Sequence, residues 1–366
     1  MGVRVLVTAS EQWAALAAVR GLAGGAFEPW VHAAEPGIYA SRSRFAAGTV
    51  LGPDPVDDPE GFAASVAAAA AEIDARVVLP GTDAALLVLS ERRAQLPDGV
   101  VLGAPDPEIV RRATAKDVLV ELAHGAGLET PPTTIVRRGD PVDDLPLPAA
   151  VKPLRSQATA RRAETREELE RALAELPGDA HAVQPWLEGT LAAVCGLAWD
   201  GRLVCCIHQE ARRIWPPEAG ISAYALTVPP DRGLEEKVGR LLGELRWSGI
   251  FQLQLLRTGD GDFPIDLNPR IYGSLALALA AGLNLPALWV ELLLGRTPRP
   301  GPYRVGVRYR AEENDLRALA SRGPLALVRG LVPRPRTTHA VLSARDPAPV
   351  LATLAKLAAQ RRRSRP

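Results

Sequence analysis

Short apolar runs alternate with longer helix-like segments over the first hundred residues of the chain. The predicted strands are 3–8, 28–32, 49–51 and 77–80, and the predicted helices are 11–22, 60–73 and 83–95. This alternation predicts an α/β unit in which helices cover both faces of a parallel sheet. Neither GxGxxG nor GxxxxGK[ST] follows the first strand. We therefore expect a scaffold, or half of a substrate site, rather than a dinucleotide-binding or P-loop domain.

A second unit begins near residue 106, where the pattern changes. Thr114 and Asp117 have the spacing of a capping box, which predicts a helix over 115–125. The next predicted elements are a strand over 149–152, a polar stretch over 154–165 and a helix over 166–176. From residue 182 onward the runs pair as antiparallel hairpins.

The predicted hairpins are 190–199 with 202–213 and 250–257 with 262–267, and the predicted helices are 234–246, 274–281 and 285–294. Asp200-Gly201 is a strong two-residue turn signal for the first hairpin. Prolines after residue 297 indicate a linker to a C-terminal appendage that ends in a frayed basic tail, 361–366. The predicted units are 1–105, 106–183, 184–297 and 298–366.

Charge and hydropathy exclude several classes of protein. Lys and Arg number 43 against 42 Asp and Glu, so no net field favours nucleic acid or an anionic membrane. The longest apolar runs, such as 275–283, are shorter than the roughly 20 residues of a membrane span. The first ten residues read as an opening strand rather than a leader peptide. We expect a cytoplasmic protein that binds neither nucleic acid nor membrane.

The three cysteines, Cys195, Cys205 and Cys206, are too few for a disulfide framework, and no CxxC or HExxH spacing occurs. If Asp200-Gly201 closes the first hairpin, Cys195 lies directly opposite Cys206. We interpret the cysteines as buried apolar thiols in a reducing compartment.

The segment 249–274 holds the most informative polar pattern. Alternate residues of a strand share a face, so Asp266, Asn268 and Arg270 can project together until Pro269 ends the ladder. A hairpin centred on Asp260 places Gln254 opposite Asp266 and Gln252 opposite Asn268. Carboxylate and amide oxygens on one face suit Mg²⁺, although a solvent-facing polar hairpin explains the spacing equally well.

This segment resembles the closing motif of the ATP-grasp superfamily, an acid-x-Asn-Pro-Arg-x-x-Gly-Ser pattern preceded by a metal ligand. The resemblance extends in order over most of 116–295. Lys116-Asp117 and Val151-Lys152-Pro153 are similar to the family's two ATP lysines, and VQPWLEG (183–189) is similar to its adenine hinge. RIWPPEAGIS (213–222) resembles a stretch of the predicted carboxylate–amine ligases, which are related to carbamoyl-phosphate-synthase-type domains.

The resemblance implies a pre-ATP-grasp domain, a two-lobed α+β ATP-grasp domain and a small C-terminal appendage. The ATP contacts implied are Lys116, Lys152, Gln184, Trp186, Leu187 and Glu188; the metal ligands are Gln254, Asp266 and Asn268; the catalytic residues are Arg270 and Arg213, with Arg212 as runner-up for Arg213. A buried lysine such as Lys152 is costly unless it is paired, which a phosphate would achieve. A solvated lysine remains the alternative at both lysine positions.

The implied activity is an ATP-dependent ligase that uses Mg²⁺, or Mn²⁺ in its place, to join a carboxylate to an amine through an acyl phosphate. The implied partners are these two small molecules, and a homodimer is left open. Pro80-Gly-Thr-Asp83 is a candidate edge of the acceptor pocket, or simply a helix N-cap.

Two departures keep other functions open. The lid segment 154–162 has no glycine, so Ser156, Thr159 or arginines would replace it, and Gln254 stands where glutamate is common. A phosphotransferase that forms no amide, or a catalytically weak nucleotide-binding scaffold, is therefore retained as an alternative.

Overall fold

The computed structural model describes residues 2–8, 12–25, 27–35, 37–154 and 160–363, with the side chains of 356–363 left out. Its N-terminal unit is a parallel sheet in the strand order β3-β2-β1-β4-β5. The strands are β1 (Val3–Val7), β2 (Phe27–Ala33), β3 (Gly48–Leu51), β4 (Val77–Leu79) and β5 (Val101–Leu102). The alternating pattern of the sequence is thereby confirmed as a parallel α/β unit.

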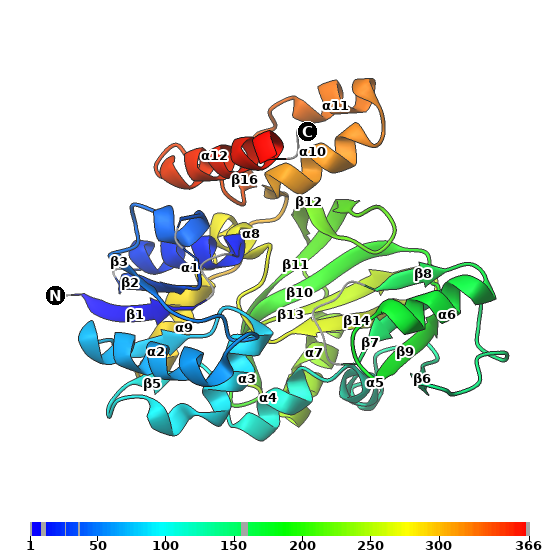
Figure 1. Ribbon diagram of the computed structural model, residues 1–366, viewed down its shortest axis with the longest axis horizontal. Coiled ribbons are helices and arrows are strands. Elements are labelled where there is room, and N and C mark those ends of the chain that lie inside the picture. The colour runs from blue at the N-terminus through cyan, green and yellow to red at the C-terminus, as the bar shows by residue number, and fades with distance from the viewer. Residues whose placement is uncertain (1, 9–11, 26, 36, 155–159, 364–366) are drawn as a thin grey trace.

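Helices cover both faces of this sheet (Figure 1). They are α1 (Trp13–Gly24), α2 (Pro59–Glu72) and α3 (Asp83–Glu91), with short 3₁₀ turns η1 (Tyr39–Arg42) and η2 (Arg93–Gln95). Leu6 and Val78 face α2 and α3, whereas Val5 and Leu79 face α1. Alternate strand residues point to opposite faces, so a parallel strand covered on both sides must be apolar throughout.

The small lobe is an antiparallel sheet in the order β6-β9-β7-β8. Its strands are β6 (Thr134–Arg137), β7 (Ala149–Pro153), β8 (Arg161–Ala163) and β9 (Ala180–Pro185), and its helices are α4 (Pro107–Ala113), α5 (Lys116–Gly125) and α6 (Arg166–Glu175). The unit boundary predicted after residue 183 falls inside β9, which continues into the hinge. Thr165 caps α6 by accepting the amide hydrogen of Glu168 at 3.3 Å.

The predicted capping box at Thr114 is wrong. Ala115 is the N-cap of α5 and makes no side-chain cap, while the Thr114 hydroxyl donates to the carbonyl of Val110 at 3.0 Å. The physical reason is that Thr114 ends α4, where its hydroxyl finds the free carbonyls of the preceding turn. The helix still begins at Lys116, so the expected place of this lysine in the first turn is confirmed.

The large lobe is built on a sheet in the order β14-β13-β10-β11-β12-β15-β16. Its elements are β10 (Thr190–Trp199), β11 (Arg202–Trp215), β12 (Ile221–Val228), α7 (Arg232–Leu245), β13 (Gly249–Arg257), β14 (Asp262–Asn268), α8 (Leu275–Ala281) and α9 (Leu285–Leu293). Both predicted hairpins form. However, Cys206 pairs with Gly196 rather than with Cys195, because a bulge at Leu197/Ala198 shifts the register by one residue.

The C-terminal residues join the large lobe instead of forming a separate appendage. Strands β15 (Arg308–Arg310) and β16 (Thr337–His339) extend the large sheet, and α10 (Glu312–Ala320) and α11 (Pro324–Leu331) lie above it (Figure 1). Helix α12 (Ala348–Arg363) instead packs against η1 of the N-terminal unit. The predicted boundary at residue 298 therefore does not divide the sheet. Residues 361–363, expected in a frayed tail, belong to α12, and the rest of that tail lies outside the described residues.

One buried carboxylate ties the C-terminal segment to the N-terminal unit. Asp346 is fully buried and accepts hydrogen bonds from Arg20 Nε at 3.0 Å, Ser43 Oγ at 2.7 Å and the Arg44 amide at 2.9 Å. A buried charge that is paired and hydrogen-bonded in this way holds two elements in a single arrangement.

Within the described residues, no individual helix has the length and apolar composition to cross a membrane; α8 and α9, which meet at a 93° bend, reach that composition only as a pair.

Candidate active site

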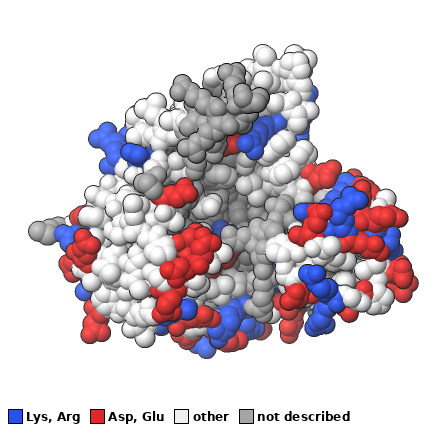
Figure 2. All heavy atoms as spheres, viewed as in Figure 1, with Lys and Arg blue, Asp and Glu red and all other residues white. Residues whose placement is uncertain are grey.

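A cavity of about 1230 Å³ lies where the N-terminal unit, the small lobe and the large lobe meet. Figure 2 shows the hollow from its open side, with charged residues of both signs mixed over the surface around it. Of the residues predicted from the sequence to form a site, the following line the cavity: Lys116, Lys152, Gln184, Trp186, Leu187, Glu188, Gln254, Asp266, Asn268 and Arg270. The fold therefore brings to one place residues that are separated by more than 150 positions.

Lys152 stands at the end of β7 and points into this cavity. Its Nζ donates to Gln184 Oε1 at 2.9 Å and to the Ile265 carbonyl at 3.4 Å. Burial and, to a smaller extent, the nearby ammonium of Lys116 lower the pKa of Lys152 to about 8, against the opposing effect of Asp266. Two lysines close enough to repel each other form a site that favours an added anion.

The polar strand face that the sequence predicted on the second hairpin forms with the expected register. Gln254 pairs with Asp266 and Gln252 with Asn268, and a bulge next to Gln254 changes the register only toward the turn. Asn268 Nδ2 donates to Asp266 Oδ2 at 3.4 Å and to Gln252 Oε1 at 3.3 Å. Lys116 Nζ contacts Asp266 Oδ1, so a cation already lies against the carboxylate of this face.

Arg270 reaches the N-terminal unit from the end of this hairpin. Its guanidinium binds Asp83 with two hydrogen bonds, of 2.9 and 3.2 Å, and donates to Asn268 Oδ1 at 2.9 Å. Asp83 is the first residue of α3, whose N-cap is Thr82. The predicted N-cap at Pro80-Gly-Thr-Asp83 is thus confirmed, and the same loop also lines the cavity. A fork-to-fork pair of this kind fixes the direction of the guanidinium.

The segment between the lobes, residues 186–189, follows β9 without regular structure. The Trp186 amide donates to the Pro148 carbonyl at 2.8 Å, and the guanidinium of Arg162 lies 4.8 Å from the Trp186 ring. Glu188 is exposed at the cavity edge. Arg162 belongs to the predicted lid segment, of which residues 155–159, including Ser156 and Thr159, lie outside the described residues.

Arg213 is not brought to the cavity. Its guanidinium binds Asp315 of α10 through Nε at 2.5 Å and a second nitrogen at 3.1 Å, and it lies 4.3 Å from the Tyr224 ring. The runner-up, Arg212, is half exposed and pairs with Glu210 at 3.1 Å. Since Asp315 is buried and already binds Arg213, the geometry gives this arginine a structural contact instead of the predicted catalytic one.

A buried polar network beneath the polar face of the second hairpin was not predicted from the sequence as part of the site. Gln252 donates to Ser274 Oγ at 3.2 Å, and Ser274 donates to Gln209 Oε1 at 3.0 Å. Tyr309 OH and Trp13 Nε1 both donate to the Gly273 carbonyl, at 2.9 and 3.0 Å. Gly273 and Ser274, which end the closing motif, were the sequence signal that could have indicated this network. Ser274 makes the contacts with Gln252 and Gln209, and the Gly273 carbonyl accepts from Tyr309 and Trp13.

Comparison with known proteins gives a family match over part of the chain. Residues 179–315 match a family model described as "ATP-grasp in the biosynthetic pathway with Ter operon". The sequence finds no match among curated proteins.

Three solved structures illustrate the likeness in fold. L-amino acid ligase from Bacillus licheniformis has a TM-score of 0.64 at 16% identity, over 84% of this chain and 78% of that one. N5-carboxyaminoimidazole synthetase from Staphylococcus aureus, complexed with ADP, has a TM-score of 0.65 at 11% identity, and the match covers 84% of this chain and 81% of that one. The biotin carboxylase domain of 2-oxoglutarate carboxylase from Hydrogenobacter thermophilus was solved in complex with MgADP and bicarbonate. It has a TM-score of 0.64 at 15% identity, and the match covers 84% of this chain and 73% of that one. Residues 179–315 therefore match an ATP-grasp family model, and the chain as a whole shares its fold with these solved structures.

Proposed function

We propose that this protein is an ATP-dependent ligase that joins a carboxylate to an amine. The observation that carries the proposal is the convergence on one cavity of two lysines, a carboxylate–amide face and an arginine held in a fixed direction. Phosphoryl transfer requires mainly positioning and neutralisation of charge, which these groups supply. The L-amino acid ligase among the structural neighbours supports this class of reaction.

In the proposed first step, an oxygen of the substrate carboxylate attacks the γ-phosphorus of ATP, and ADP leaves with the electrons of the broken P–O bond. Lys116 and Lys152 bind the phosphate oxygens, and Arg270 faces the transferring group. In the second step, the amine nitrogen attacks the acyl-phosphate carbonyl, inorganic phosphate leaves and the nitrogen loses a proton. Because Asp83 and Asn268 hold Arg270, its charge is oriented before substrate arrives.

The backbone and side chains of Gln184, Trp186, Leu187 and Glu188 are proposed to bind the nucleoside. Gln184 is held between Lys152 and Thr133 Oγ1, to which it donates at 2.8 Å. Glu188, exposed at the rim, is positioned to accept hydrogen bonds from a ribose. Trp186, stacked under Arg162, forms part of the wall.

The donor set of the metal-binding face fits a hard divalent cation. Asp266 supplies a carboxylate, and Gln254 and Asn268 supply amide groups on the same strand face, as Mg²⁺ or Mn²⁺ requires. When bound, such an ion would neutralise phosphate charge. The contact of Lys116 with Asp266 supports this proposal, because the carboxylate already lies against one positive charge. We propose that Lys116 leaves Asp266 for a phosphate oxygen when the metal and ATP bind together.

The test is to measure ADP release while amino-acid and other carboxylate–amine pairs are screened in the presence of Mg²⁺, with product mass recorded for each active pair. Asp266→Asn and Lys152→Met serve as inactive controls. ADP with an amide product supports the proposal. A phosphorylated product that accumulates without amine would indicate a phosphotransferase, and ATP binding without ADP from any pair would indicate a scaffold. The Gln254→Glu variant should tighten Mg²⁺ binding, because it adds a charge opposite Asp266.

The proposed reaction also keeps the cytoplasm as the predicted location, since ATP and Mg²⁺ are abundant there. A homodimer remains a prediction, which measurement of molar mass in solution would decide.

A further inference from the structure

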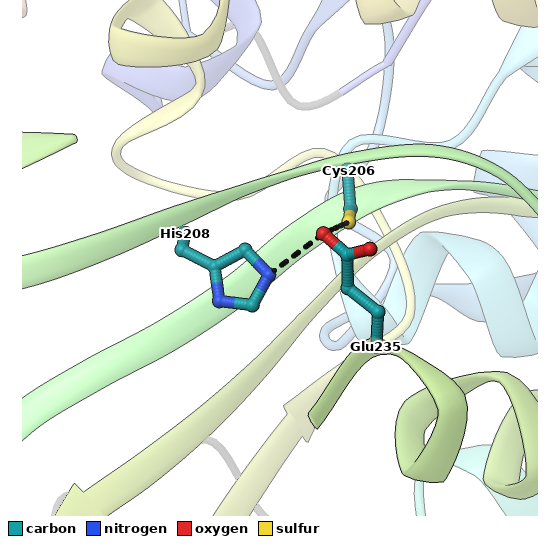
Figure 3. A group of neighbouring side chains, drawn as sticks. All are labelled: Cys206, His208 and Glu235. Carbon is teal, nitrogen blue, oxygen red and sulfur yellow. Dashed lines mark hydrogen bonds and ion pairs between the residues drawn. The ribbon is translucent and has the colours of Figure 1, made fainter. Parts of the chain in front are cut away.

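A second group of potential ligands lies on the large lobe, on the face of the sheet that packs against α7. It consists of Cys206 and His208 from β11 and Glu235 from the first turn of α7 (Figure 3). Residues two apart on a strand share a face, so Cys206 and His208 both point toward the helix. Cys205 and Gln209 belong to the opposite face, where Gln209 joins the network under the cavity. The group is therefore distinct from the proposed active site.

The three side chains are already close to the spacing of a metal site. His208 Nε2 lies 3.1 Å from Glu235 Oε1, and Cys206 Sγ lies 3.5 Å from the same oxygen. All the ligand atoms lie within 4.8 Å of one another. Bond lengths of about 2.0–2.3 Å in a tetrahedral zinc site place neighbouring ligand atoms roughly 3.3–3.8 Å apart. Small side-chain rotations would be enough to bring the three atoms around one ion.

The charge balance of the group also favours a cation. Among the described residues, the ion pairs of Glu235 include no lysine or arginine, and its partner is His208. By contrast Glu210, two residues beyond His208 on the same face, is matched by Arg257 at 2.7 Å and Arg212 at 3.1 Å. A carboxylate placed beside an imidazole and a thiol, with no lysine or arginine in its ion pairs within the described part of the chain, favours an added cation.

We propose that Cys206, His208 and Glu235 bind a zinc ion, with a fourth position open to water or an exogenous ligand. Thiolate, imidazole and carboxylate are the zinc ligands found in proteins, and three protein ligands leave one position free. Glu235 is 29% exposed whereas His208 is 3% exposed, so an ion would enter from the helix side. The ion would join the N-terminal turn of α7 to the middle of the large sheet.

Binding would also release a proton. Burial and the Glu235 carboxylate raise the pKa of the Cys206 thiol, so the thiol is protonated at pH 7, and a coordinated thiol is deprotonated by the metal. No oxidant or reductant is involved, because the sulfur stays in the same oxidation state.

The proposal is tested with the full chain, freed of metal by a chelator and titrated with Co²⁺ and then Zn²⁺. Cobalt bound by a thiolate gives a charge-transfer absorption band, which zinc should remove by displacement. We expect one such site per chain. Cys206→Ser should abolish the band, and His208→Gln and Glu235→Gln should weaken zinc binding by at least about 100-fold, more than the loss of an outer-sphere partner costs.

Cys205→Ser is the matched control, because it removes the neighbouring thiol on the opposite face of β11 and should leave the band unchanged. All measurements are repeated without ATP in the Asp266→Asn variant. This variant lacks the carboxylate of the proposed Mg²⁺ site, so binding of the added metal at that site does not affect the result. If Cys206→Ser does not fold, Glu235→Gln at its partly exposed helix position gives the decisive measurement. Absence of a thiolate–cobalt band in the unmodified chain, or its loss in Cys205→Ser instead of Cys206→Ser, would overturn the assignment. Neither result depends on whether the protein is a ligase.

Discussion

Replacing Lys152 with methionine should weaken ATP binding while leaving the fold intact or more stable. The pKa of Lys152 is lowered from 10.5 to about 8, so protonating this amine costs about 3 kcal/mol more in the folded chain than in an unfolded one. Methionine removes that cost and keeps most of the apolar stem. It also leaves Gln184 Oε1 and the Ile265 carbonyl without this donor, which costs about 1–2 kcal/mol. The net expectation is a gain of about 1–2 kcal/mol in the free energy of unfolding at pH 7.

The gain should depend on pH in a defined direction. Because the folded pKa of Lys152 lies below the unfolded value, the wild-type chain carries the full penalty below about pH 8 and loses it as the pH rises toward 10.5. The stability advantage of Lys152→Met should therefore be constant at and below neutral pH, shrink as the pH rises above about 8, and reverse by about pH 10.5, where only the loss of the two hydrogen bonds remains. The ATP affinity of the wild-type chain should fall above about pH 8, as the ammonium loses its proton.

Two measurements check this reasoning. Calorimetric titration with ATP should show that Lys152→Met binds about 5- to 150-fold more weakly, corresponding to the roughly 1–3 kcal/mol of a hydrogen bond to a charged group. Denaturant unfolding across the pH range should show this advantage shrinking and then reversing. The reasoning is refuted if the variant is less stable than wild type at pH 7 and binds ATP with unchanged affinity, since Lys152 would then be an ordinary structural lysine.

Three further substitutions separate chemistry from packing. Asp266→Asn nearly preserves shape but removes the charge of the metal-binding face, so Mg²⁺-dependent ADP release should collapse with little change in melting temperature. Leu267→Ala, on the buried side of the same strand, should instead lower the free energy of unfolding by roughly 2–5 kcal/mol, and a denaturation curve identical to wild type would contradict its burial. Arg213→Met breaks the ion pair with the buried Asp315, so it should lower the free energy of unfolding by up to about 3–5 kcal/mol, and by less if Arg310, which lies 2.9 Å from Asp315, compensates. The kcat of this variant should stay near the wild-type value. A large loss of kcat at unchanged stability would restore the predicted catalytic role of Arg213.

Local patterns in the sequence were sufficient for the elements and for much of the site. Apolar alternation predicted the parallel N-terminal sheet, and the turn at Asp260 predicted the pairing of Gln254 with Asp266. The hairpin depends on residues near one another in the chain, and each strand of the parallel sheet is marked by its own apolar run, although its partner strand is distant in sequence. The ordered motifs that resemble the ATP-grasp superfamily predicted most of the residues that share the cavity, but they also predicted Arg213, which does not line it.

What the tertiary structure decided are the contacts between distant segments. The partner of Arg213 is Asp315, about a hundred residues away, and that of Arg270 is Asp83 in another unit. The bulge at Leu197/Ala198 moved Cys206 away from the position opposite Cys195, and only the packing of α7 on β11 brought Glu235 to Cys206 and His208. The C-terminal strands likewise joined the large sheet because its edge offered unpaired backbone groups. A charged side chain pairs with a group that the folded chain brings close to it in space, and the separation of the two residues in the sequence does not predict that distance.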